Sequence, residues 1–158
     1  MKTKKHENNP VLTGEHAWGD AGQLILFVIF LIVWIADSFF LNYSTLRLDS
    51  FPLLMRIATA FIIFTFSGNL ASKGLKIVFK ENREKPEVIK KGPFRFVRHP
   101  IYLASVLLYT GFLVISVSLL STMVWFIAIV FYYYIARYEE KILIVEFGED
   151  YLQYKKEA

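Results

Sequence analysis

The feature that most constrains this chain is a run of 35 residues without a charge, from Ile101 to Ile135. As one straight α-helix this run would be about 52 Å long, whereas the hydrocarbon core of a bilayer is only about 30 Å thick. Small hydroxyl residues gather near its middle. We therefore predict a break there and a tight hairpin of two membrane-spanning helices, roughly 100–117 and 119–137. The residues that mark the break are Ser116, Ser118, Ser121 and Thr122.

Two further apolar segments precede the hairpin. The first, residues 24–41, is close to the roughly 20 residues that a helix needs to cross a bilayer, and the second runs from about residue 52 to 71. With 55% hydrophobic residues, the chain is too apolar for an ordinary soluble domain. We expect an all-α membrane protein with about four transmembrane helices, forming a single domain over residues 23–158 after a tail of residues 1–22.

Positive charge is concentrated between the second and third spans. Nine of the 18 Lys and Arg residues lie within residues 73–98. Because such excess marks the cytoplasmic side of a membrane, we expect this loop and both termini inside, which in a prokaryote means the inner membrane. Apolar spans on both sides favour contact with membrane lipids over a nucleic-acid patch, so no nucleic-acid partner is expected. The same topology predicts an inner-interface belt of Tyr132, Tyr133, Tyr134 and Tyr138.

Two shorter amphipathic patterns lie outside the spans. Leu75, Val78 and Phe79 share one helical face and the neighbouring lysines do not, which predicts an interfacial helix that Pro86 interrupts. After Arg137, a last helical pattern predicts a cytoplasmic C-terminal helix. One stripe of this helix has the acid Glu140 at its head, followed by Ile144, Phe147, Tyr151 and Tyr154.

Two ionisable residues, Asp37 and Arg56, lie within apolar segments at similar expected depth. We favour a structural ion pair between them. A proton-coupled or substrate-binding acid is the functional alternative, because ionisable residues in a membrane are often functional, and it would suit a small transporter or binding protein. Exposure to water at the outer surface is the third interpretation.

The segment from Gly92 to Tyr102, G-P-F-R-F-V-R-H-P-I-Y, joins the basic loop to the apolar hairpin. Proline disfavours helical geometry in the residue before it and is accepted at the first helical position. We therefore expect His99 to be the cap and Pro100 the first residue of a helix. Such a helix start, beside Arg98, attracts anions.

Folding the hairpin about Ser118 brings His99 level with residue 139, so that Arg98 and His99 face Glu139 and Glu140. A cationic helix start opposite two acids is complementary to a zwitterion such as an amino acid. Tyr102 lies about one turn further into the helix. The simpler interpretation is that His99 only caps the helix, Arg98 meets lipid phosphate and the glutamates form a solvated turn.

The sequence also resembles a known group of membrane enzymes. R-H-P-I-Y at 98–102, E-E at 139–140 and F-G at 147–148, followed by Tyr151 and Tyr154, resemble the isoprenylcysteine carboxyl methyltransferase and phospholipid methyltransferase family over about residues 68–154. The resemblance implies an S-adenosylmethionine pocket that opens to the cytoplasm. His99 and Tyr102 then correspond to pocket residues, Arg98 and Pro100 shape the loop, and Glu139 and Glu140 match the acidic pair.

Of the two acids, we favour Glu140 for direct contact with the cofactor, because its stripe faces protein. The implied acceptor is amphipathic or lipid-like, and no residue identifies itself as a catalytic base. The chain has no cysteine, which excludes a thiol nucleophile. His16 and Asp20 alone are too few ligands for a metal site, so none is expected. Two other functions remain as alternatives to a methyltransferase. One is a nicotinamide-dependent membrane reductase, and the other is the small transporter or binding protein described above.

Overall fold

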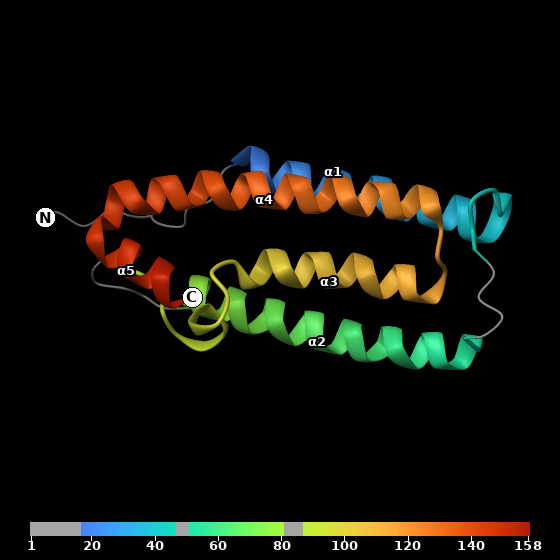
Figure 1. Ribbon diagram of the computed structural model, residues 1–158, viewed down its shortest axis with the longest axis horizontal. Coiled ribbons are helices and arrows are strands. Elements are labelled where there is room, and N and C mark those ends of the chain that lie inside the picture. Colours follow the sequence, from blue (N-terminus) through green and yellow to red (C-terminus); the bar gives the residue numbers. More distant parts are fainter. Residues whose placement is uncertain (1–16, 47–50, 81–86) are drawn as a thin grey trace, which may run out of the picture.

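The computed structural model describes residues 17–46, 51–80 and 87–158. Four long helices run side by side in alternating directions, and a short fifth helix folds against one end (Figure 1). They are α1 (Ala17–Ile35), which continues as a π-helical segment (Ala36–Leu41), α2 (Leu53–Lys80), α3 (Pro100–Ile115), α4 (Leu119–Phe147) and α5 (Glu149–Glu157). A 3₁₀ turn, Gly92–Arg95, precedes α3.

The all-α membrane class is confirmed by the lengths and composition of these helices. Three segments of the described chain are long and apolar enough to cross a membrane, namely Ala21–Leu41, Leu53–Phe79 and Leu119–Phe147. α3 is a shorter apolar helix of 16 residues, about 24 Å long. It packs along α2, which makes the most extensive helix pair in the bundle. Four crossings therefore remain a prediction.

The predicted hairpin is present, and its turn is tight. α3 ends at Ile115 and α4 begins at Leu119, so only three residues connect them. The Ser118 side chain caps α4 by accepting a hydrogen bond from the Ser121 backbone N–H at 3.1 Å, and both serines are fully buried. The hydroxyl residues thus end one helix and start the next, as their position in the apolar run suggested.

The expected interfacial helix is not a separate element. Residues 73–80 instead continue α2 without interruption. No proline between Ala71 and Lys80 stops the helix. Gly74 lies where α2 closely approaches the start of α3, because a Cβ at this position would be 2.9 Å from Ile101 Cγ1. Pro86 lies outside the described residues.

The C-terminal region also differs from the expected stripe. α4 continues through Arg137 to Phe147, and the chain then turns at Gly148, whose φ of +53° is a conformation that side-chain-bearing residues rarely adopt. α5 therefore folds back against the bundle and buries Tyr151 and Tyr154.

The predicted tyrosine belt is wrong for one of its members. Tyr133 and Tyr134 are well exposed, but Tyr132 is buried in the core, because it lies on the face of α4 that meets α1 and α3. The buried residues of this core are Phe30, Trp34, Tyr109, Ala128 and Tyr132.

The expected ion pair between Asp37 and Arg56 is wrong: within the described ranges, each residue has other partners. Asp37 Oδ1 accepts hydrogen bonds from the backbone N–H groups of Tyr43 (3.0 Å) and Ser44 (2.9 Å), and Oδ2 accepts one from the Ser44 hydroxyl (2.6 Å). The Arg56 guanidinium donates to the Ile115 carbonyl at 3.1 Å. The unpaired backbone N–H groups of the turn after α1 lie next to the Asp37 carboxylate, so it bonds to them and not to Arg56 on α2.

This Asp37 turn also closes the end of the bundle opposite α5. The Leu46 N–H donates to the Val117 carbonyl at 2.8 Å, and the Leu119 N–H donates to the Ser44 carbonyl at 3.2 Å. The turn after α1 is thereby joined to the turn between α3 and α4.

We predict that Asp37→Asn destabilises the protein by about 1.5–3 kcal/mol, because an amide nitrogen would face N–H donors that now meet a carboxylate. The apparent melting temperature in detergent, followed by circular dichroism, measures this loss. Asp150→Asn, at an exposed position of α5, is the matched control. Equal melting temperatures for the two variants would contradict the structural role of Asp37.

Candidate functional site

The predicted site residues meet where the loop before α3, the last part of α4 and α5 come together (Figure 1). As expected, α3 begins at Pro100 with His99 as its N-cap residue. The His99 side chain makes no capping hydrogen bond. Its ring instead lies parallel to that of Tyr102, with 5.5 Å between ring centroids and 7° between planes. The His99 ring is therefore held by stacking and directed towards α4.

Glu140 is the centre of the site. One carboxylate oxygen lies 2.7 Å from Arg98 Nη1, and the other lies 2.6 Å from Lys155 Nζ. Arg137 Nη1, one turn earlier on α4, is 3.9 Å away. The Glu140 side chain is only 6% exposed, so these charges attract one another with little screening by water. This carboxylate joins the loop, α4 and α5 to one another.

Glu139, the second acid, contacts the start of α3. The Tyr102 hydroxyl donates a hydrogen bond to one of its oxygens, and the other oxygen lies 3.4 Å from His99 Nδ1. His99 Nε2 is 3.7 Å from Glu140, and this buried nitrogen has no hydrogen-bond partner in the described part of the chain. The expected juxtaposition of Arg98, His99 and Tyr102 with the two acids is therefore present.

α5 holds the loop of the site in place. The Tyr154 hydroxyl donates to the Phe94 carbonyl at 2.6 Å, and the Tyr151 and Tyr154 rings pack edge to face. Burial raises the pKa of both phenols, and for Tyr151 the nearby Glu140 carboxylate raises the pKa further. Both groups are therefore neutral at neutral pH, and the Tyr154 hydroxyl remains a hydrogen-bond donor.

Two residues of the site were not predicted. Lys155 reaches Glu140 only because the chain reverses at Gly148, and the F-G pair at 147–148 was the available signal for that turn. Tyr132 was assigned to the membrane interface, but its ring centroid lies 5.5 Å from that of Tyr102.

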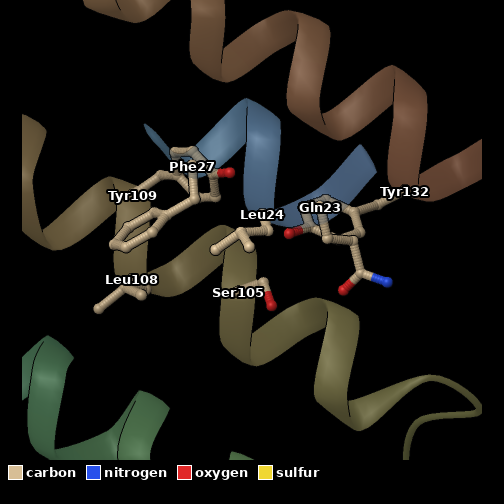
Figure 2. Close-up of a pocket in the computed structure, with 7 residues that line it drawn as sticks. All are labelled: Gln23, Leu24, Phe27, Ser105, Leu108, Tyr109 and Tyr132. Atoms are coloured by element: carbon tan, nitrogen blue, oxygen red, sulfur yellow. The ribbon is translucent and has the colours of Figure 1, made fainter. Parts of the chain in front are cut away.

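A cavity of about 270 Å³ lies between α1, α3 and α4, and Figure 2 shows its lining side chains. Tyr132 lines this cavity and also packs against the Tyr102 ring, so the cavity adjoins the charged site. None of the lining residues carries a charge. They are Gln23, Leu24, Phe27, Ser105, Leu108, Tyr109 and Tyr132.

The arrangement suits a ligand that carries both an anionic and a cationic group. Arg98 and Lys155 provide positive charge beside Glu140. Both side chains are about one-third exposed, so an anion can approach them. Glu139 accepts only one short hydrogen bond among the described residues. The aromatic rings of His99 and Tyr102 lie beside these charges.

The comparisons with known proteins support a family assignment. A family model described as phospholipid methyltransferase matches residues 50–150, which is more than half of the 158 residues and includes α3, both glutamates and Gly148. No curated protein matches the chain, and no solved structure matches it.

We predict that Tyr154→Phe loosens the loop before α3, because the half-buried Phe94 carbonyl loses a hydrogen bond that contributes about 0.5–1.5 kcal/mol. Hydrogen–deuterium exchange measures this, and the amides of Phe94, Phe96 and Val97, which bond within the 3₁₀ turn, should exchange about tenfold faster. Tyr133→Phe, at an exposed position on α4, is the control. Unchanged exchange in the Tyr154 variant would show that α5 does not support the loop.

Proposed function

The chain belongs to the phospholipid methyltransferase family, and on that premise we propose that it transfers a methyl group from S-adenosylmethionine to an amphipathic or lipid-like acceptor. The family is one of methyltransferases that act on lipid-like substrates. The proposal adds the cofactor, the residues that bind it and the side of the membrane on which it binds.

The main support is the cluster of opposite charges at the start of α3. The cofactor has an amino-acid head with a carboxylate and an ammonium group. Arg98 and Lys155 bind the carboxylate, and the first N–H groups of α3, left unpaired by the helix start at Pro100, supply further donors. Arginine in particular suits a carboxylate because it can donate two parallel hydrogen bonds.

The roles of the two acids follow from their partners. Each oxygen of Glu140 already faces a close cation, so Glu140 acts by holding Arg98 and Lys155 in position. The distance from Glu139 Oε2 to His99 Nδ1 is 3.4 Å, which is longer than a normal hydrogen bond. This oxygen can therefore still accept a hydrogen bond from an ammonium group. From the sequence we favoured Glu140 for direct contact, whereas these distances favour Glu139.

His99 and Tyr102 complete the pocket. The buried Nε2 of His99 has no partner in the described residues and is available to a polar group of the ligand. The Tyr102 ring, held by His99 and Tyr132, adds aromatic surface beside the charges, which favours a nearby positive charge.

The bound cofactor supplies an electrophilic methyl group on a positively charged sulfur. The residues of the chain position the acceptor in line with that methyl group and exclude water. A lone pair of the acceptor forms the new bond to carbon, the bond from carbon to sulfur breaks, and its electron pair stays on sulfur. An amine acceptor in its ammonium form gives its proton to bulk water before it enters the site, because only then does its nitrogen have the lone pair that attacks.

The proposed site faces the cytoplasm. Nine Lys and Arg residues lie within 73–98 of the sequence, and the described parts of this segment, the end of α2 and the loop before α3, lie at the same end of the bundle as the site (Figure 1). Such an excess of positive charge is typical of the inner side of a membrane. Asp37 uses its oxygens within its own turn, so it gives the transporter hypothesis no support.

We predict that the purified protein binds S-adenosylhomocysteine and that two variants each weaken this binding by about tenfold or more. Glu140→Ala releases Arg98 and Lys155 from their positions, and His99→Ala removes a ring nitrogen that is available to the ligand. Isothermal titration calorimetry measures the affinities. The Glu140 variant can fold because Arg98 and Lys155 remain partly exposed to water.

The control for this titration is Asp37→Asn, measured below its melting temperature, which should bind normally because Asp37 lies at the other end of the bundle. If Asp37→Asn weakened binding more than Glu140→Ala, the transporter hypothesis would be favoured. Saturable binding of NADPH without binding of S-adenosylhomocysteine would favour a reductase.

We predict that membranes containing the protein transfer label from methyl-labelled S-adenosylmethionine into the organic extract of a lipid mixture, and that His99→Ala reduces this label at least tenfold. Thin-layer chromatography of the extract identifies the labelled class. Label found only in water-soluble products would refute a lipid-like acceptor.

A further inference from the structure

We propose that the cavity between α1, α3 and α4 binds the uncharged, hydrogen-bonding part of an amphipathic molecule. The inference rests on the proposed function in one respect only: it takes this molecule to be the methyl acceptor. The family-model match begins at residue 50, so the α1 side of this cavity lies outside the matched region.

The polar lining of the cavity points to a hydrogen-bonding occupant. Ser105 and Tyr109 come from α3, Tyr132 comes from α4 and Gln23 comes from α1 (Figure 2). Tyr109 is only 1% exposed, and its hydroxyl makes no hydrogen bond of normal length among the described residues, with the Tyr132 hydroxyl as a polar neighbour. A ligand whose polar atom completes the hydrogen bonding of this buried hydroxyl gains affinity.

The lining offers no oppositely charged partner to a charged group. No Lys, Arg, His, Asp or Glu lines the cavity. A carboxylate placed there would gain no cation, and an ammonium group would gain no acid, only hydroxyl, amide and aromatic partners. The part of the ligand that occupies the cavity is therefore neutral, as in an alcohol, a phenol or an amide.

The volume limits the size of that part. A cavity of about 150 Å³ accommodates benzene, so a cavity of about 270 Å³ has room for roughly ten non-hydrogen atoms. The rest of the molecule extends towards the bilayer past Leu24, which lines the cavity and is 64% exposed.

The cavity also adjoins the proposed cofactor site. Tyr132 lines the cavity and packs against Tyr102, which bonds to Glu139 and stacks on His99. Ser105 follows Tyr102 by about one turn of α3. A molecule held in the cavity therefore lies next to the aromatic wall of the charged cluster, where a methyl acceptor has to be.

The test uses 2-naphthol, a neutral bicyclic phenol of suitable size, with the full chain in lipid nanodiscs. Fluorescence anisotropy should show saturable binding above that of empty nanodiscs. Tyr109→Phe should weaken this binding by about threefold to tenfold, the loss of one hydrogen bond. Binding of naphthalene, which has no hydroxyl, should be the same in both proteins.

Tyr109→Phe should still fold, because the ring remains and the hydroxyl that it removes makes no hydrogen bond of normal length among the described residues. Gln23→Leu, at a half-buried position on α1, is a second variant that should weaken naphthol binding if the first does not fold. Tighter binding of 2-naphthoate or of a naphthylmethyl ammonium ion than of 2-naphthol would overturn the proposal. Equal naphthol affinity in all three proteins would also overturn it.

Failure of this inference can be distinguished from failure of the proposed function. Binding of S-adenosylhomocysteine without saturable naphthol binding overturns the cavity proposal and leaves the methyltransferase proposal intact. Naphthol binding that depends on Tyr109, without any binding of S-adenosylhomocysteine, supports the cavity as a binding site and overturns its role for a methyl acceptor.

Discussion

The carboxylate of Glu140 is the interaction on which the site depends. It is nearly buried and faces Arg98 from the loop before α3 and Lys155 from α5. A buried acid is costly unless it is paired, so burial and pairing require each other here. Because the two cations come from segments far apart in the chain, the pairing fixes the loop and α5 relative to α4. The proposed ligand-binding charges are thereby placed before any ligand arrives.

The other end of the bundle has a comparable acid with a different purpose. Asp37 accepts hydrogen bonds from its own turn, and that turn pairs with the turn between α3 and α4. The hairpin is thus held at its closed end, and His99 and Glu139 meet at its open end. Buried polar groups at both ends therefore specify how the apolar helices align, which apolar packing alone specifies weakly.

The hairpin, the helix start at Pro100 and the meeting of His99 with Glu139 and Glu140 were all predictable, because each follows from local signals and from equal distances to one turn. The ends of α2 and α4 were not, since neither contains a proline that would stop it. Asp37 was paired with the wrong partner because depth alone cannot show that a turn's own N–H groups are nearer.

The sequence by itself determined the helical membrane class, the closing turn of the hairpin and the motif that assigns the family. Those properties depend on composition, proline geometry and residue spacing along the chain. Only the tertiary structure decided that Lys155 joins Glu140, that Tyr132 is buried beside Tyr102 and that a neutral cavity lies behind them. The reason is physical: these features depend on the direction of the chain after Gly148 and on the face that α4 presents to α1 and α3, which no single segment encodes.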